Sequence, residues 1–254
     1  MPANPFKAAL REGRVQIGLW TALASAYTAE IVAGAGFDWI VLDGEHAPND
    51  VPMLLAQLQA VAGTSTHPVL RPPTDEAWLI KQYLDIGARN LIIPMVESAE
   101  QAAALVRAVR YPPAGIRGVG SAIARASRWN RVPDYLRDAD DGICLLVQAE
   151  TARALDHLED IAAVPGIDGV FIGPADLAAS LGHLGAPDHP TVVAAIEDAL
   201  TRLQRLGMPS GILTGDDAMI RRCLALGCRF IAVGTDVTLL ARGSETLAMR
   251  YREA

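Results

Sequence analysis

Residues 142–182, GICLLVQAETARALDHLEDIAAVPGIDGVFIGPADLAASLG, contain two short apolar runs, ICLLV at 143–147 and DGVFI at 168–172. An aliphatic run of this length followed by helical sequence is typical of a buried strand in a parallel sheet. Each run is followed within a few residues by a carboxylate, Glu150 or Asp176. Functional groups of such folds gather beyond the carboxyl ends of the strands, so we expect these two acids to lie close together.

Glu150 and Asp176 are candidate ligands of a divalent metal. Hard cations such as Mg²⁺ and Mn²⁺ prefer oxygen ligands, and one or two carboxylates are commonly completed by water and substrate oxygens. Acids are also frequent at helix N-termini, and a simple capping role fits the same two residues. The rest of the chain has to distinguish these two interpretations.

The composition limits the class of protein. With 254 residues, 51% of them hydrophobic, the chain suits one large α/β domain or two small ones. A net charge of −7 argues against nucleic acid as a partner. No apolar run is long enough for a membrane span and no signal pattern opens the chain, so we expect an unexported, cytoplasmic protein. The three cysteines have no zinc-type spacing, and we expect reduced thiols.

Alternating strand and helix patterns continue along the whole chain. Apolar runs bounded by turn residues predict eight strands, at 15–20, 37–42, 67–71, 89–93, 143–147, 168–172, 210–213 and 230–233. Capping residues and helical periodicity predict helices at 5–11, 25–33, 51–62, 75–86, 98–110, 191–206, 217–226 and 236–251.

Eight strands that alternate with helices predict a (β/α)₈ barrel, a single domain over residues 1–254. An open doubly wound sheet is the alternative, but its usual five or six strands would leave two of the predicted strands unplaced. Residues 111–140 have no clear period and carry five arginines. Because long irregular segments in compact domains are usually functional or at an interface, this segment is a candidate for either role.

In a barrel the reactive groups belong at the carboxyl ends of the strands. Asp43 and His46 follow the second strand, where the carboxylate could orient the imidazole as a general base. Arg71 ends the third strand and could hold a carboxylate or an enolate oxygen. Gln148 could bond a metal-bound water. The only lysines, Lys7 and Lys81, are not at strand ends, so a carbonyl substrate would be activated by metal and not by a Schiff base.

With these residues in view, the chain resembles the 4-hydroxy-2-oxoheptanedioate (HpcH/HpaI) family of class II pyruvate aldolases over nearly its whole length. The resemblance is carried by DWIVLDGEHAPND at 38–50, RGVGS at 117–121, SRWN at 127–130, QAE at 148–150 and FIGPADL at 171–177. Several such strings in the same order are far more specific than any one motif.

The resemblance implies a barrel that binds Mg²⁺, Mn²⁺ or Co²⁺ through Glu150 and Asp176. Pyruvate would chelate the metal through its carboxylate and keto oxygens. Gly173, Pro174 and Ala175 would lie against pyruvate, with backbone donors reaching its carboxylate. The implied reaction is the reversible cleavage of 4-hydroxy-2-oxo acids to pyruvate and an aldehyde, for example of 4-hydroxy-2-oxoheptanedioate to pyruvate and succinic semialdehyde.

By the same resemblance Arg71 would polarise the keto oxygen and stabilise the enolate, and the His46/Asp43 pair would handle the proton of the aldol hydroxyl. Asp85 matches an acid that enters the site from a neighbouring subunit. Leu213 is expected to form an apolar wall of the site. Members of the family form homohexamers, often with the last helix exchanged between paired subunits, so the same assembly is expected here.

Other functions stay open at this point. Relatives cleave 2-keto-3-deoxyglucarate or 2-keto-3-deoxy-rhamnonate, and the aldehyde partner cannot be read from the sequence. Acyl-CoA lyases and oxaloacetate decarboxylases pass through a related metal-bound enolate. A non-catalytic barrel that binds a 2-oxo acid as a sensor is a different class of protein, although the metal-binding acids beside His46 and Arg71 favour an enzyme.

Overall fold

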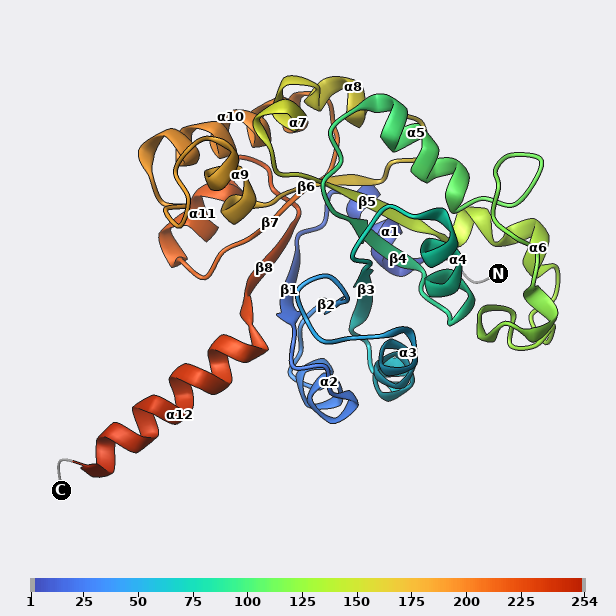
Figure 1. The fold of residues 1–254 in the computed structure, drawn as a ribbon, viewed down its shortest axis with the longest axis horizontal. Coiled ribbons are helices and arrows are strands. Elements are labelled where there is room, and N and C mark those ends of the chain that lie inside the picture. The colour runs from blue at the N-terminus through green and yellow to red at the C-terminus, as the bar shows by residue number, and fades with distance from the viewer. Residues whose placement is uncertain (1–2, 253–254) are drawn as a thin grey trace.

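The computed structural model describes residues 3–252, and its eight parallel strands close into a barrel (Figure 1). The strands follow one another around the barrel in chain order, and β1 pairs with β8. Their bounds are β1 Gln16–Thr21, β2 Trp39–Asp43, β3 His67–Arg71, β4 Asn90–Ile93, β5 Cys144–Ala149, β6 Gly169–Ile172, β7 Ser210–Leu213 and β8 Phe230–Thr235. The predicted (β/α)₈ barrel is confirmed, and the open doubly wound sheet is excluded.

Most helices cover the outside of the barrel and return the chain to the start of the next strand, whereas α1 lies at one end of the barrel and α12 follows the last strand. They are α1 Pro5–Arg11, α2 Ala26–Ala33, α3 Val51–Ala60, α4 Ala77–Asp85, α5 Ala99–Ala108, α6 Tyr135–Asp138, α7 Ala152–Asp156, α8 Leu158–Ala162, α9 Pro174–Ser180, α10 Pro190–Arg205, α11 Asp217–Ala225 and α12 Asp236–Arg252. Among these residues, no helix is both long and apolar enough to cross a membrane.

The barrel interior is filled by large side chains, many of them aromatic. Trp20, Trp39, Phe171 and Phe230 pack there with aliphatic residues of β2–β5 and β8. Phe6 of α1 joins this cluster, and its ring centroid lies 5.9 Å from that of Trp39. Helix α1 therefore closes the end of the barrel opposite the carboxyl ends of the strands, and the site can open at one end only.

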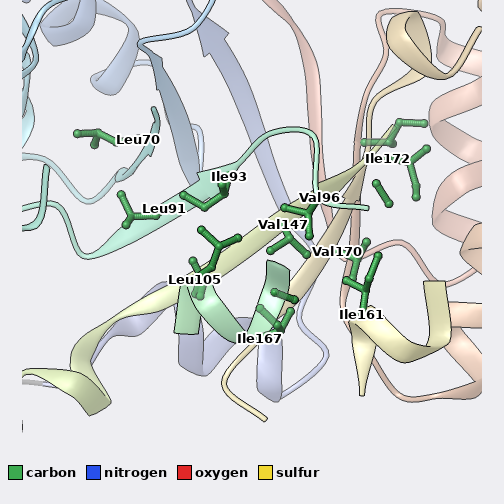
Figure 2. Close-up of a cluster of buried hydrophobic side chains, with 14 of the residues drawn as sticks. Leu70, Leu91, Ile93, Val96, Leu105, Val147, Ile161, Ile167, Val170 and Ile172 are labelled. Atoms are coloured by element: carbon green, nitrogen blue, oxygen red, sulfur yellow. The ribbon is translucent and has the colours of Figure 1, made fainter. Parts of the chain in front are cut away.

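A second apolar layer lies between the barrel and its helices. Figure 2 shows part of it, where side chains of β4, β5 and β6 meet Leu105 of α5 and Ile161 of α8. Because alternate strand residues point inward and outward, both faces of these strands are buried. This explains why the strand sequences read as continuous apolar runs.

The structure adds detail to the predicted elements, including three short helices, α7, α8 and α9, that the sequence analysis did not predict. Strand β5 continues to Ala149, so Glu150 is the first residue after the strand. The irregular segment contains α6 and three short 3₁₀ turns, at Ser121–Ile123, Arg125–Ser127 and Asp140–Gly142. Helix α12 does not pack along the barrel; it leaves β8 and extends away from it (Figure 1).

Candidate functional site

The site is built around a buried ion pair between the ends of β2 and β3. Asp43 and Arg71 are opposite each other in the β2–β3 register. Arg71 donates from Nε to Asp43 Oδ1 at 2.9 Å and from Nη2 to Oδ2 at 2.7 Å. Burial opposes the charged form, but the hydrogen bonds and charge of Arg71 outweigh it and lower the pKa of Asp43. The carboxylate thus fixes the plane of the guanidinium.

Trp20 of β1 forms the base of this pair. Its Nε1 donates to Asp43 Oδ2 at 3.1 Å, and the guanidinium carbon of Arg71 lies 4.6 Å from the centroid of its ring. An arginine stacked on an aromatic ring and held by a bidentate carboxylate has little freedom to rotate. Arg71 is therefore a preorganised cation in the barrel mouth.

The remaining nitrogen of Arg71, Nη1, faces the centre of the mouth. It lies 2.6 Å from Glu45 Oε2 and 3.5 Å from Gln148 Oε1. Gln148 in turn donates from Nε2 to Glu150 Oε2 at 2.7 Å. Gln148 therefore links the arginine to the first candidate metal ligand.

Glu150 is buried at the end of β5 and has two hydrogen bonds. Its other oxygen, Oε1, accepts the backbone N–H of Met95 at 2.8 Å. Burial raises the pKa of Glu150 to about 7, and the negative charges of Asp176 and Glu45 act in the same direction. A carboxylate cluster of this kind favours a cation, because a cation would relieve the repulsion between the acids.

Asp176 lies in the first turn of α9, directly after the Gly-Pro-Ala segment that follows β6. Gly173 starts this turn, and a side chain at this position would displace Glu150. A Cβ there would lie 2.8 Å from Glu150 Cβ and closer still to Glu150 Oε2. The missing side chain lets the α9 backbone approach the Glu150 carboxylate.

The two acids fit a metal that takes few protein ligands. Within residues 3–252 no group of three or more His, Cys, Asp or Glu side chains is arranged to hold a metal ion. Glu150 and Asp176 would therefore supply two carboxylates and leave the remaining positions to water and substrate oxygens. That ligand set is usual for Mg²⁺ and Mn²⁺.

His46 lies beside the site but not on the acid that the sequence predicted. The Asp43 carboxylate is occupied by Arg71 and Trp20, and only the backbone N–H of His46 points to it, at 3.4 Å. The His46 side chain is 68% exposed, and its Nε2 lies 4.0 Å from Glu45 Oε2. The β2–β3 register puts Asp43 opposite Arg71, and among the described residues no hydrogen bond joins the Asp43 carboxylate to the His46 imidazole, so the pairing of these two side chains stays a prediction.

Glu45 also stands at the end of β2, but the sequence assigned it no role in the candidate site. Its signal was its position in the DGEH string, between Asp43 and His46. Burial raises the pKa of Glu45, and the charges of Arg71 and His46 oppose that shift. Nothing in the sequence showed that its carboxylate would contact Arg71, since that contact depends on how the chain turns after β2.

Asp85 lies away from the barrel mouth of its own chain. It ends α4 shortly before β4 begins, and therefore lies toward the amino ends of the strands. There it accepts a hydrogen bond of 3.0 Å from Arg117, which is buried and also donates to the Tyr135 hydroxyl at 3.2 Å. Any contribution of Asp85 to a site would have to be made to a neighbouring subunit.

A largely apolar cavity of about 670 Å³ lies at the ends of β7 and β8 and reaches Pro174 of α9, two residues before Asp176. Pro174 and Leu213, both candidate substrate contacts, lie in its wall with Met219 of α11. Leu213 is half-buried and packs against the aromatic cluster of the barrel interior. A small organic substrate could extend from the carboxylates toward this cavity.

A family model described as HpcH/HpaI aldolase/citrate lyase matches residues 16–243. The chain belongs to this family. The suspected family resemblance is thereby confirmed, and the match spans every strand of the barrel. As an HpcH/HpaI family aldolase, the protein is a carbon–carbon lyase, as expected.

Similar proteins carry two different names. The hydroxypyruvate/pyruvate aldolase of Deinococcus radiodurans is 62% identical over 99% of this chain and 91% of its own length. The 4-hydroxy-2-oxo-heptane-1,7-dioate aldolase of Klebsiella pneumoniae is 59% identical over 98% of this chain and 94% of its own length. A crystal structure of an HpcH/HpaI aldolase/citrate lyase family protein from Burkholderia cenocepacia has a TM-score of 0.94 at 42% identity, and covers 98% of this chain and all of that one.

The mouth of this HpcH/HpaI aldolase combines a rigid cation with two carboxylates and an adjacent apolar space. Such an arrangement can stabilise negative charge that develops on an oxygen of a small acid. It offers no lysine for a covalent intermediate, because neither Lys7 nor Lys81 is at a strand end.

Proposed function

We propose that this HpcH/HpaI aldolase reversibly cleaves 4-hydroxy-2-oxo acids to pyruvate and an aldehyde, and that it depends on a divalent metal, Mg²⁺, Mn²⁺ or Co²⁺. The observation that supports the proposal is a chain of hydrogen bonds from Arg71 through Gln148 to Glu150. It holds the Arg71 guanidinium close to Glu150, a candidate metal ligand. Cleavage of the carbon–carbon bond leaves a pyruvate enolate, and its negative charge needs such partners.

Several candidate residues have a direct part in this reaction, and Asp43 and Gln148 hold Arg71 and Glu150 in place for it. Glu150 and Asp176 would hold a divalent cation, which would supply Lewis-acid stabilisation of the negative charge that develops on pyruvate. Arg71 donates hydrogen bonds to the keto oxygen and to the enolate oxygen that replaces it. His46 accepts the proton of the aldol hydroxyl. Leu213 lies against the carbon chain of the aldehyde.

Backbone groups after β6 complete the proposed pyruvate site. Pro174 has no N–H, but the backbone N–H groups of Ala175 and Asp176 lie in the first turn of α9 and have no partner within the helix. They can donate to the pyruvate carboxylate, which would lie against Gly173, Pro174 and Ala175. Asp85 of a neighbouring subunit would complete the site from the other side.

The names of the relatives suggest two 2-oxo acids, pyruvate and hydroxypyruvate, as the nucleophile in the condensation direction. The Klebsiella enzyme is named for 4-hydroxy-2-oxo-heptane-1,7-dioate, and cleavage of that acid would release pyruvate and succinic semialdehyde. The Deinococcus enzyme is named for hydroxypyruvate as well as pyruvate. Hydroxypyruvate is therefore a second candidate nucleophile. 2-Keto-3-deoxyglucarate and 2-keto-3-deoxy-rhamnonate stay alternative substrates for cleavage.

The test is a metal-dependence assay on the whole protein. Protein treated with EDTA should release no pyruvate from 4-hydroxy-2-oxoheptanedioate or a 2-keto-3-deoxy sugar acid, and activity should return with Mn²⁺ or Mg²⁺. Condensation of pyruvate or hydroxypyruvate with a common aldehyde ranks the two nucleophiles. Full activity after chelation would contradict the metal dependence. Binding of pyruvate without any turnover would favour the sensor, and turnover of oxaloacetate or a thioester alone would favour the decarboxylase or the acyl-CoA lyase.

We also propose a homohexamer in which α12 packs on a neighbouring subunit. Helix α12 projects from the barrel (Figure 1), and five of its large apolar side chains are more than half exposed: Leu239, Leu240, Leu247, Met249 and Tyr251. Monomeric proteins rarely leave such a face uncovered. The mass of the protein in solution tests this assembly, and a monomer at micromolar concentration would contradict it.

The segment between α5 and β5 supports the same assembly. It exposes Ile116, Val119, Ile123, Trp129 and Leu136. Arg117, the neighbour of Ile116 in the chain, donates a hydrogen bond to Asp85, whose side chain is 26% exposed, so Asp85 lies close to a face that a second copy could cover. We also propose a cytoplasmic location. The three cysteines are buried and form no disulfide, which fits a reducing compartment.

A further inference from the structure

The turn between β4 and α5, residues 94–98, is bonded to the end of β5, where the candidate metal ligand Glu150 lies. The backbone N–H of Met95 donates to Glu150 Oε1 at 2.8 Å. The next backbone N–H, that of Val96, donates to the carbonyl of Gln148 at 3.0 Å. The position of this turn therefore decides whether one oxygen of the buried Glu150 carboxylate has a donor.

Met95 reaches Glu150 with its backbone in a left-handed conformation, with a φ of 55°. A residue other than glycine is uncommon in this region, and it persists there only where its surroundings hold it. The Met95 side chain is 45% exposed. The contacts that can hold the residue in this conformation are therefore those of its backbone.

Gln101, in the first turn of α5, supplies these contacts. Its Nε2 donates to the Met95 carbonyl at 3.2 Å, and its Oε1 accepts the backbone N–H of Glu97 at 2.9 Å. The same Nε2 donates to Asp75 Oδ2 at 2.9 Å, so the amide is held from outside the turn as well. One side chain thus bridges the turn from Met95 to Glu97.

We propose that Gln101 is a positioning residue for the metal ligand Glu150, and that it acts through the backbone of Met95. This rests on the proposed metal-dependent function. Glu150 Oε1 accepts from Met95 and Oε2 accepts from Gln148, so the plane of the carboxylate is fixed. Each oxygen keeps a lone pair that a cation can use. The ligand is therefore oriented before a metal binds.

Loss of Gln101 would release this arrangement from the side of the turn. Met95 would lose the partner of its carbonyl, and its φ could relax toward the ordinary negative range. Its N–H would then turn away from Glu150 Oε1. The buried oxygen would be left without a donor, and the carboxylate would have to be ordered by the metal itself. Hydrogen bonds to the ligands of a metal are commonly worth about 10- to 100-fold in metal affinity.

The dissociation constant of Mn²⁺, measured by calorimetry on EDTA-treated protein, tests the role without turnover. Gln101→Ala should weaken Mn²⁺ binding by about tenfold or more. Gln101→Glu keeps an acceptor for the Glu97 N–H and should recover part of the affinity. In the cleavage assay, the Mn²⁺ concentration for half-maximal rate should rise by the same factor in Gln101→Ala, and saturating Mn²⁺ should restore most of kcat.

Two further comparisons separate positioning from a general loss of stability. Ser98 Oγ accepts the backbone N–H of Gln101 at 3.2 Å and caps the same helix, so Ser98→Ala should lower the melting temperature but bind Mn²⁺ as the wild type does. Gln59→Ala, at an exposed glutamine of α3, should change neither quantity. At Met95, valine is disfavoured in the left-handed region and glycine is not, so Met95→Val should weaken Mn²⁺ binding more than Met95→Gly.

Unchanged Mn²⁺ affinity in Gln101→Ala would overturn the role. Equal losses in Gln101→Ala and Ser98→Ala would also overturn it, because they would trace the effect to the stability of α5. A wild type that binds no Mn²⁺ would instead contradict the proposed metal dependence, and the role of Gln101 with it.

Discussion

Arg71 and Asp43 face each other across β2 and β3, and Arg71 donates two hydrogen bonds to the Asp43 carboxylate, from Nε to Oδ1 at 2.9 Å and from Nη2 to Oδ2 at 2.7 Å. Because the pair is buried, its loss affects the stability of the fold as well as the orientation of Arg71 in the site. Removing one partner leaves the other as a buried charge without compensation.

Arg71→Ala should reduce kcat/KM for aldol cleavage by about 10²-fold or more, since one preorganised donor to a developing oxyanion is typically worth about 3 to 4 kcal/mol. The same change should lower the free energy of unfolding by about 3 to 5 kcal/mol, because Asp43 loses its partner. Steady-state kinetics and urea unfolding measure the two effects.

The double variant Arg71→Ala with Asp43→Ala is the control for this prediction. It removes both charges, so it should regain part of the lost stability while cleavage stays as low as in Arg71→Ala. Turnover close to wild type in either variant would show that Arg71 has no part in the chemistry.

The raised pKa of Glu150 predicts how the free energy of unfolding of the metal-free protein depends on pH. Its pKa is raised to about 7 from an ordinary value of 4.5, mainly by burial. Between pH 4.5 and pH 7 the folded state holds a proton on Glu150 that the unfolded state has released. The contribution of Glu150 to stability is therefore greatest below pH 4.5 and is lost as the pH rises toward 7. The loss should be on the order of 3 kcal/mol.

Glu150→Gln should abolish that part of the dependence, because an amide does not titrate. The comparison is made by thermal or urea unfolding of both proteins in EDTA at pH 5, 6, 7 and 8. Mn²⁺ binds the deprotonated carboxylate, so added Mn²⁺ should stabilise the wild type more at pH 8 than at pH 6. Equal pH dependence in wild type and variant would show that Glu150 is not the group responsible.

Gly173→Ala should weaken metal binding without unfolding the protein. The added Cβ would overlap the Glu150 side chain, and Glu150 could yield only by moving its carboxylate. We expect a loss of about tenfold or more in Mn²⁺ affinity, measured by calorimetry. Gly63→Ala, at a position where a Cβ meets nothing within 4 Å, is the matched control and should bind Mn²⁺ as the wild type does.

Arg117→Met should destabilise the protein by about 1.5 to 3 kcal/mol, because the change removes the hydrogen bonds that Arg117 donates to Asp85 and to the Tyr135 hydroxyl. Arg117 is fully buried, and its guanidinium carbon lies 4.4 Å from the centroid of the Tyr111 ring. Arg137→Met removes a surface arginine of the same segment that is 73% exposed, and should change stability by less than about 1 kcal/mol. Urea unfolding compares the two variants, and equal effects would contradict the structural role of Arg117.

Much of the fold could be predicted because periodicity and strand-end chemistry are local properties. The continuous apolar runs predicted the strands, and the capping residues Ser25, Asp50 and Ser98 all bond the first turns of their helices. The place of α12 could not be predicted in the same way. Its amphipathic pattern is equally compatible with packing on its own barrel and with packing on a second subunit.

The sequence by itself determined that there are eight strands alternating with helices, and therefore a barrel. It also placed Asp43, Arg71, Gln148 and Glu150 at strand ends, because the length of each apolar run shows where the strand stops. The tertiary structure decided which of these residues touch. The β2–β3 register paired Asp43 with Arg71, and the turn after β2 placed Glu45 between Arg71 and His46. Such contacts join residues that are distant in the chain or separated by a turn, and their geometry follows from the register and twist of the closed barrel.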